Sequence, residues 1–378
     1  MLTSTCRWTA ETGWNIPPLH PGDPGLVLYF GASSLMDGNA APIHELVAKF
    51  PNSVVCGCST AGEILASRVH DESVVASLVW FDSTRVRAVA EPIANNADSM
   101  AVGRRAAAEL DAPDLRHVLI LSEGLTVNGT ALMAGFREVL APNVAITGGL
   151  AGDGPQFKKT FVGLGNSVKS DQLVAVGFYG DGLVVSYSSR GGWEGFGPRR
   201  LITRAEGNTL FMLDGQPALD LYKRYLGARA SELPATGLLF PLELTQSLTH
   251  TNGLVRTILA VDEETRSLTF AGDMPEGWYA RLMKATTEQL VDGAACAGNA
   301  AANTHTDASL AILVSCVGRR LVLGQRIEEE LEAVIDSLPK SAQAIGFYSY
   351  GEVCPGNLGD ASELHNQTMT ITVLGERT

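Results

Sequence analysis

The sequence has no Cys-x-x-Cys pair, and its 378 residues include only six cysteines. Cysteines in that number and spacing indicate neither a disulfide framework nor a zinc site. Positive charge is also scarce, because 28 lysines and arginines stand against 41 aspartates and glutamates. This balance argues against binding to nucleic acid or to an anionic membrane surface.

Long apolar runs and targeting signals are missing as well. The first residues, MLTSTCRWTAETGW, lack a basic region followed by an apolar core, and the longest apolar run, near LAILVSCV, is too short to span a bilayer. We therefore expect a cytoplasmic protein without membrane insertion. Hydrophobic residues make up 45% of the chain, which is ample for the core of one large domain or two.

Glycine loops are the most informative feature that the sequence does contain. The stretch VVCGCSTAGEI, residues 54–64, runs from an apolar strand into Gly57-x-x-x-x-Gly62, the skeleton of a phosphate-binding loop. Glu63 stands where such a loop needs lysine, so its charge has the wrong sign for a phosphate. A nucleophile elbow is excluded too, because Gly62 lies one place too far from Ser59.

The same pattern recurs along the chain. The stretch AIGFYSYGEV, residues 344–353, again joins an apolar strand to a glycine loop followed by an acid, Glu352, and a shorter version ends in Asp153. Repetition at similar offsets indicates a duplicated unit of strand, helix, strand and glycine loop. We expect three such units to superpose: residues 26–63, 118–153 and 310–352.

These units predict an α/β fold. Continuous apolar strands joined by helices require crossover connections, so we expect mixed, largely parallel sheets built from repeated strand-helix-strand units. The stretches GLLFPLEL and LVRTILAVDEETRSLTFAGDMPEG, in the C-terminal half, have β-branched runs around an acidic turn. They predict an additional antiparallel hairpin there.

Several stretches taken together resemble the FIST sensory family. They are VVCGCSTAGEI, ITGGLAGDG, GGWEGFGP, DGQPALDLYKRYLG, MPEG, GFYSYGEVCP and LHNQTMTITVLGE. The resemblance covers nearly the whole chain, from about residue 26 to about residue 375. It implies an N-terminal lead-in over residues 1–24, a FIST N-terminal domain over 25–220 and a FIST C-terminal domain over 221–378.

The resemblance also implies a function. FIST proteins are sensory and signal-transduction modules that bind small ligands, so we expect this chain to bind an amino acid or a related polar metabolite. It would report to a separate signalling protein, such as a histidine kinase or a cyclic-dinucleotide enzyme, and a homodimer is compatible with that role. No nucleophile–base pair or metal-ligand spacing in the sequence indicates an enzyme.

A second interpretation comes from the same family. A chain of this length also resembles the NosP proteins, FIST proteins described as haem-binding nitric oxide sensors that act on separate histidine kinases. Because the sequence has no Cys-x-x-Cys-His motif, haem b would be held non-covalently. His365 is the first candidate for its axial ligand, followed by His250 and His305.

The candidate ligand-binding residues come from the glycine loops, the Gly-Trp loop and the terminal polar motif. The glycine loops offer hydroxyls and carboxylates suited to a polar, amine-bearing molecule, and we expect Glu63 and Glu352 to face a common cleft. Alternatively, these glutamates cap a facing loop, the tryptophan anchors its own loop, and the terminal motif is a hydrogen-bonded corner. The candidates are Ser59, Thr60, Glu63, Trp193, Ser349, Tyr350, Glu352, His365, Asn366 and Gln367.

Overall fold

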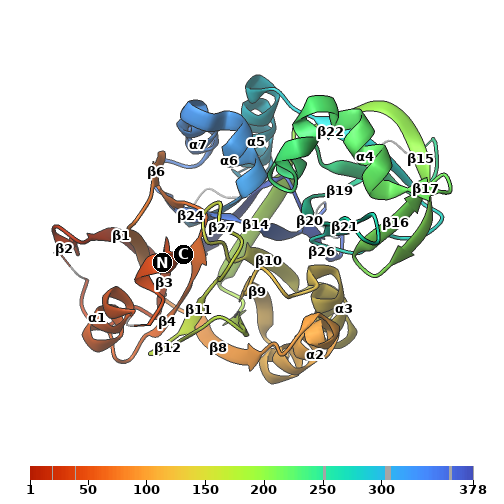
Figure 1. Ribbon diagram of the computed structural model, residues 1–378. Coiled ribbons are helices and arrows are strands. Elements are labelled where there is room, and N and C mark those ends of the chain that lie inside the picture. The colour runs from red at the N-terminus through yellow and green to blue at the C-terminus, as the bar shows by residue number, and fades with distance from the viewer. Residues whose placement is uncertain (19, 39, 250–252, 303–307, 357–359, 378) are drawn as a thin grey trace.

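The computed structural model describes all residues from 1 to 378 except 19, 39, 250–252, 303–307, 357–359 and 378 (Figure 1). Four β-sheets carry most of the described chain, and at least one helix goes with each of them. The α/β class with mixed sheets is therefore confirmed. His250 and His305, the secondary haem candidates, lie outside the described residues.

The first sheet is built around a parallel pair of strands. Its order is β12-β11-β4-β3-β7-β1-β2, and β3 runs parallel to β4 and antiparallel to β7. Helix α1, Ala41–Lys49, connects the parallel pair. The strands are β1 Leu2–Thr9, β2 Gly13–Trp14, β3 Leu26–Ala32, β4 Val54–Thr60, β7 Val74–Trp80, β11 Val162–Leu164 and β12 Ser167–Lys169.

The second sheet repeats this plan. Its order is β26-β25-β10-β9-β13-β8, with β9 parallel to β10 and antiparallel to β13. Helix α3, Gly129–Val139, connects the parallel pair and packs on α2, Ser99–Leu110. The strands are β8 Arg85–Pro92, β9 Leu115–Ser122, β10 Ala145–Leu150, β13 Gln172–Tyr179, β25 Gly351–Pro355 and β26 Ser362–His365.

The third sheet repeats the plan once more. Its order is β14-β27-β23-β24-β5-β6, with β23 parallel to β24 and antiparallel to β27. Helices α6, Val317–Leu323, and α7, Ile327–Ser337, connect the parallel pair, and α5, Thr287–Ala302, packs on α7. The strands are β5 Glu63–Leu65, β6 Arg68–His70, β14 Leu183–Arg190, β23 Ala308–Cys316, β24 Gln343–Ser349 and β27 Met369–Glu376.

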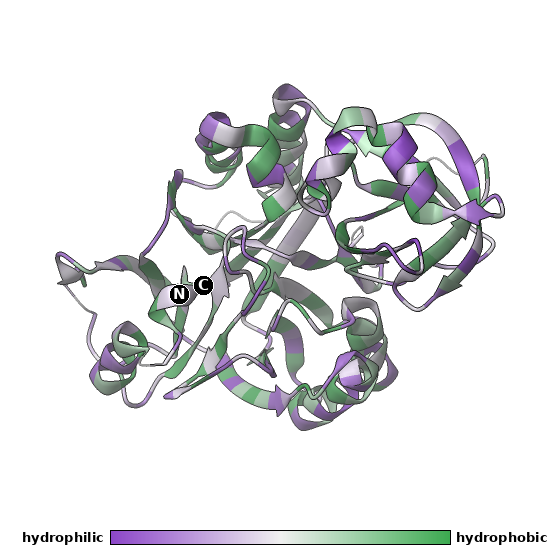
Figure 2. Ribbon diagram, viewed as in Figure 1, coloured by the Kyte–Doolittle hydropathy of each residue, from purple (hydrophilic) through white to green (hydrophobic). Residues whose placement is uncertain are grey.

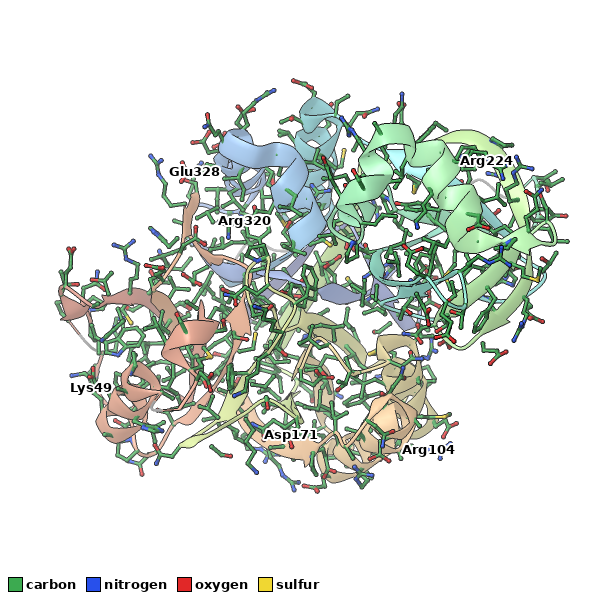
Figure 3. All side chains as sticks on the ribbon, viewed as in Figure 1. Lys49, Arg104, Asp171, Arg224, Arg320 and Glu328 are labelled. Carbon is green, nitrogen blue, oxygen red and sulfur yellow. The ribbon has the colours of Figure 1, made fainter. Side chains whose placement is uncertain are left out.

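The three units exchange hairpins in a ring. The hairpin that follows the first unit's glycine loop, β5–β6, pairs with the third sheet, and the third unit's hairpin, β25–β26, pairs with the second sheet. The second unit's hairpin, β11–β12, closes the ring by pairing with the first sheet. Ion pairs Arg320–Asp71 and Arg68–Glu328 join this first hairpin to α6 and α7. Figure 3 labels Arg320 and Glu328 on that side of the fold.

The first glycine of each loop explains the repeat in physical terms. A Cβ built at Gly57, Gly148 or Gly346 would collide with a backbone carbonyl oxygen of the neighbouring parallel strand. Only glycine allows the two backbones to approach that closely. The loop that resembles a phosphate cradle is thus a packing device between parallel strands.

The fourth sheet is entirely antiparallel, and its strands β20 and β21 form the expected hairpin. It comes between β14 and α5 in the sequence, so it separates β14 from the later strands of the third sheet. It lies to the right in Figure 1 with α4, Ala218–Leu226, packed on it. Its strands are β15 Glu194–Glu206, β16 Thr209–Leu213, β17 Gln216–Pro217, β18 Leu242–Thr245, β19 Leu254–Arg256, β20 Ile258–Asp262, β21 Ser267–Phe270 and β22 Tyr279–Lys284.

Parallel pairing is less extensive than the sequence indicated. Among the described strands, only β3–β4, β9–β10 and β23–β24 pair in parallel, because each exchanged hairpin and each following strand runs antiparallel to its neighbour. Short 3-10 helices complete the fold at Ser33–Leu35, Asn96–Asp98, Gly227–Glu232, Ala235–Leu239 and Gly324–Arg326.

The core follows the strands. Hydrophobic residues concentrate on the central strands, whereas hydrophilic residues mark the outer faces of the helices (Figure 2). Cys56 and Cys58 are buried free thiols on β4. No helix in the described part of the chain is both long enough and apolar enough to span a bilayer.

Candidate functional site

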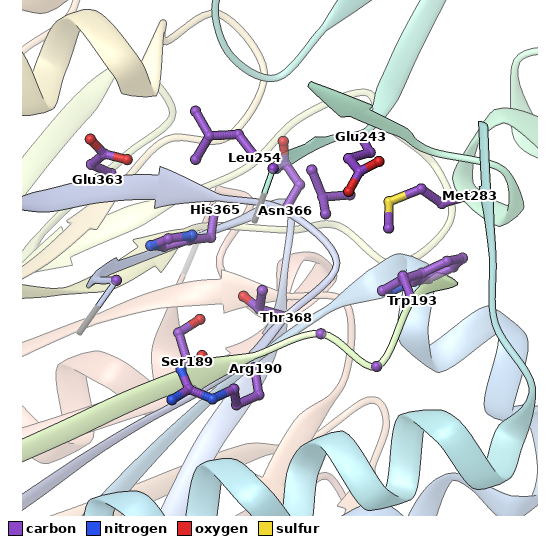
Figure 4. Close-up of a pocket in the computed structure, with 15 residues that line it drawn as sticks. Ser189, Arg190, Trp193, Glu243, Leu254, Met283, Glu363, His365, Asn366 and Thr368 are labelled. Carbon is purple, nitrogen blue, oxygen red and sulfur yellow. Dashed lines mark hydrogen bonds between the residues drawn. The ribbon is translucent and has the colours of Figure 1, made fainter. Parts of the chain in front are cut away.

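A cavity of about 590 Å³ lies where three parts of the fold meet (Figure 4). The end of β14 and the segment after it form one wall, the exchanged strand β26 and the turn after it form the second, and the fourth sheet forms the third. Its labelled lining residues are Ser189, Arg190, Trp193, Glu243, Leu254, Met283, Glu363, His365, Asn366 and Thr368.

The first wall is a short segment, residues 189–193, held against the third unit. The indole Nε1 of Trp193 donates to the carbonyl oxygen of Gln367 at 2.9 Å. Gly192 has a φ of +91°, and a side chain there would collide with the backbone of Gln289 at the start of α5. Trp193 is therefore both the anchor of its loop and part of the cavity wall.

A buried ion pair supports this wall from behind. Arg319 donates from Nη1 to the carbonyl oxygen of Gly191. Its Nη2 donates to the carbonyl oxygen of Leu290 at 2.8 Å. Its Nη2 also lies 2.8 Å from Glu330 Oε2, and both side chains are fully buried. The cavity wall is thus linked to α6 and α7 in the third unit.

Arg190 is an exposed side chain that brings positive charge to the rim of the cavity. Its Nη1 donates to the carbonyl oxygen of the adjacent Ser189 at 2.8 Å, and no carboxylate in the described part of the chain forms an ion pair with it. Burial raises the pKa of the neighbouring Cys354 thiol, and the charge of Arg190 opposes that rise. A cation without a carboxylate partner favours an anionic guest.

The second wall carries His365 as a neutral imidazole. Its Nε2 donates to the carbonyl oxygen of Cys354 at 2.9 Å, because a carbonyl can only accept. Burial lowers the pKa of His365 to about 4, with an opposing contribution from the hydrogen bond to Cys354. At neutral pH the ring therefore holds its proton on Nε2, and Nδ1 is a hydrogen-bond acceptor.

Two amides follow His365 and are fully buried. Asn366 accepts a hydrogen bond from the backbone N–H of Thr257 at 3.4 Å, whereas its Nδ2 has no partner among the described residues. Gln367 donates from Nε2 to the carbonyl oxygen of Leu238 at 2.9 Å and has a φ of +66°. Of the two, Asn366 lines the cavity.

The third wall combines a neutralised carboxylate with apolar groups. Glu243 Oε2 accepts from Arg281, whose Nη2 lies 2.8 Å away, and Arg199 approaches to 3.6 Å. Its negative charge is therefore balanced within the fold. Leu254 and Met283 line the same side, with Met283 beside Trp193 in Figure 4.

The two glutamates of the glycine loops lie elsewhere, inside the fold. Glu63 accepts from Thr60 Oγ1 at 2.7 Å and from Ser73 Oγ at 2.9 Å, just before β7 begins. Glu352 accepts in the same way from Ser349 Oγ at 2.6 Å and from Thr368 Oγ1 at 3.0 Å, just before β27 begins. Each glutamate thus bonds hydroxyls of its own unit and not, as the capping alternative expected, a facing loop.

Burial dominates the electrostatics of this pair. It raises the pKa of both Glu63 and Glu352 to about 7, although the hydroxyl hydrogen bonds act in the opposite direction. Neither carboxylate lines the cavity, although Glu352 bonds Thr368 and is the strand partner of His365, and both of these residues line it. The structure thus brings Trp193, His365 and Asn366 together, whereas the two glutamates accept hydrogen bonds from hydroxyls of their own units.

The hydroxyls of two further candidates, Ser59 and Tyr350, also form hydrogen bonds within the protein. Ser59 Oγ donates to the carbonyl oxygen of Gly152 at 2.7 Å and accepts from the backbone N–H of Phe161 at 2.8 Å. The hydroxyl of Tyr350 donates to Asp153, and Asp153 in turn accepts backbone N–H groups from residues 157–159. The third repeated acid is thus a loop cap as well.

The sequence-based candidates missed Arg190, Glu243 and Met283. Arg190 directly precedes the Gly-Gly-Trp segment, and that position is a usable signal once the segment is suspected of lining a site. Glu243 is the single charged residue of the β18 sequence LELT, and a charge within an apolar strand is another signal. Met283 has none, since methionine is common in ordinary cores.

Haem does not fit this cavity. The Nε2 of His365, the nitrogen that most often binds haem iron, is used by the carbonyl oxygen of Cys354. Charged and amide side chains, including Arg190, Glu243 and Asn366, make up much of the lining, whereas a porphyrin needs an apolar slot.

Comparison with protein families accounts for most of the chain. The FIST N domain matches residues 25–216 and the FIST C domain matches residues 218–355. A search of curated proteins found no match. FIST domains are small-ligand sensory domains of signalling proteins rather than catalytic domains. The chain therefore belongs to the FIST family, with its N and C domains in sequence order.

Proposed function

We propose that the cavity beside Trp193 is the sensory site of this protein. It binds a small polar metabolite, such as an amino acid or a relative, and the protein reports its occupancy to a separate signalling protein. The observation that carries the proposal is the position of the cavity, where the third sheet, the exchanged strand β26 and the fourth sheet meet.

This position suits a sensor because one guest would contact all three parts. A ligand changes a conformational equilibrium only if it binds the alternative states with different affinities. A guest held between Arg190 on β14 and Met283 on β22 has a different set of contacts whenever the fourth sheet shifts against the third. Its binding energy would favour one arrangement of the two sheets.

The link to the third unit offers a route for the response. The carbonyl oxygen of Gly191, in the cavity wall, accepts a hydrogen bond from Arg319, and Arg319 forms an ion pair with Glu330 on α7. A guest that moves the wall must therefore act on this buried pair. We propose a cytoplasmic histidine kinase or cyclic-dinucleotide enzyme as the protein that reads the response, with the sensor itself as a monomer or homodimer.

The test is a thermal-shift screen with amino acids and small organic acids. Leu254→Trp places an indole in the cavity, and Leu321→Trp adds the same indole on the exposed surface of α6 as a control. Compounds that stabilise the parent and Leu321→Trp should fail to stabilise Leu254→Trp. A screen without any hit for the parent, or equal shifts in all three proteins, would contradict the proposal.

The haem alternative is tested on the same preparation. Protein expressed with haem supplied should show no Soret band, because His365 Nε2 is engaged and the cavity is polar. A Soret band that shifts with nitric oxide and disappears in His365→Ala would replace the metabolite sensor by a haem-based gas sensor.

A further inference from the structure

The cavity is lined by two side chains that have N–H groups without partners among the described residues, the Arg190 guanidinium and the Asn366 amide. We infer that its guest is an organic carboxylate, whose anionic group meets Arg190 and whose apolar body lies against Trp193 and Met283. This inference rests on the proposed function and names the chemical group that the site selects. On this account the carboxylate of an amino acid is recognised, and its ammonium group is not.

Arg190 supplies the charge. Its guanidinium has one hydrogen bond among the described residues, to the carbonyl oxygen of Ser189, which leaves most of its five N–H donors free. A guanidinium matches a carboxylate with two parallel hydrogen bonds, and such charge-assisted bonds are stronger than neutral ones. The backbone of Arg190 ends β14 in register with Met369 on β27, and its side chain is exposed, so a guest would displace water from these N–H groups.

Asn366 supplies a second donor. Its side chain is fully buried in the cavity wall, yet its Nδ2 has no partner in the described part of the protein. A buried donor without a partner costs free energy, and that cost is recovered when an acceptor arrives. Since Oδ1 is already used by the N–H of Thr257, the group that remains available is the amide N–H.

Among the described residues, the cavity wall holds no deeply buried, unpaired carboxylate that would attract an ammonium group. The charge of Glu243 is balanced by Arg281 and Arg199. Glu363 lies 3.7 Å from Arg137 and is 45% exposed, so solvent screens it. His365 is neutral and offers only a weak acceptor at Nδ1. The balance of charge therefore favours an anion.

The experiment compares three compounds that share one apolar side chain: leucine, leucinamide and 4-methylpentanoate. Binding is followed by tryptophan fluorescence and by calorimetry on the whole chain. Leucine and 4-methylpentanoate should bind, whereas leucinamide, which lacks a carboxylate, should bind about 10- to 100-fold more weakly, as expected for the loss of a charge-assisted hydrogen bond.

Two arginine variants locate the effect. Arg190→Gln should weaken binding of both acids by about 10- to 100-fold and leave leucinamide nearly unchanged. Arg224→Gln, which removes the same charge from an exposed position on α4 (Figure 3), should change nothing. Asn366→Asp keeps the acceptor for Thr257 but turns the free donor into an anion, and it should weaken the acids as well.

The outcomes separate this inference from the proposed function. The inference is overturned if leucine and leucinamide bind equally well, or if the two acids bind Arg190→Gln as tightly as they bind the parent. The proposed sensory site would still stand in that case, provided that a compound from the screen stabilises the parent and fails to stabilise Leu254→Trp. Failure of all three compounds to bind the parent would also overturn it. The proposed function is contradicted only if no compound in the full screen stabilises the parent, or if the compounds that do so stabilise Leu254→Trp equally.

Discussion

The Arg319–Glu330 pair gives the sharpest test of how the cavity wall is supported. Arg319 donates to Glu330 Oε2 from Nε at 3.0 Å and from Nη2 at 2.8 Å, and neither side chain has any exposed surface. Glu330 Oε1 also accepts from Tyr348 at 2.6 Å and from Ser315 at 3.1 Å. These four hydrogen bonds stabilise the carboxylate of Glu330, which is shielded from water.

Glu330→Gln keeps the shape of this side chain and removes its charge. Because a buried guanidinium would then lack its counter-ion, we expect the free energy of unfolding to fall by about 3–5 kcal/mol. Urea denaturation followed by circular dichroism measures the change. Glu332→Gln, an exposed position on the same helix, is the control and should stay within about 0.5 kcal/mol of the parent.

A double variant checks the cause. Arg319→Met in the Glu330→Gln background removes the unpaired charge, so it should be more stable than Glu330→Gln alone. If Glu330→Gln unfolds within about 0.5 kcal/mol of the parent, the pair does not support the wall and the proposed link to α7 fails.

Further predictions concern protonation and close packing. Glu63 and Glu352 have folded pKa values raised to about 7 from 4.5, so the folded state binds more protons between these values, and its stability should fall as pH rises from about 5 to 7. Glu352→Gln should flatten that fall in a pH series of thermal melts, and an unchanged slope would show that Glu352 is not its source. Burial alone would raise the pKa of Glu376, but hydrogen bonds from Thr84 Oγ1 and the N–H groups of residues 82–84 lower it to about 2. The stability that it contributes should be lost as pH falls from about 4.5 towards 2, and Glu376→Gln should lose it at neutral pH too. Gly346→Ala should destabilise the protein or prevent folding, because its Cβ would strike the backbone of Leu313, whereas Gly165→Ala, in open space at a φ of +56°, should cost about 1 kcal/mol.

The sequence predicted the units of the fold better than their assembly. Each parallel pair and its helix are close in sequence, so apolar strands and glycine spacing were enough to predict them. The exchanged hairpins were not predictable in this way. Strand β5 is only three residues long, and its partner β24 lies about 280 residues further along the chain. Such pairings depend on tertiary packing.

The candidate site was predicted in part. Trp193, His365 and Asn366 were chosen for their polar or amphipathic character, and all three line one cavity. Glu63 and Glu352 were chosen because they repeat, but repetition also marks a structural tie that each unit needs. Sequence alone could not separate the two, because a buried carboxylate that accepts hydroxyl hydrogen bonds suits either role. Any contact of these glutamates with a ligand stays a prediction.

The most direct test of the account is a crystal structure of the protein with a compound that stabilises it in the screen. The account predicts that the compound lies in the cavity beside Trp193, with its carboxylate at Arg190 and its apolar part towards Met283. A compound seated elsewhere, for example in the hollow lined by His44 and Lys159, would contradict it.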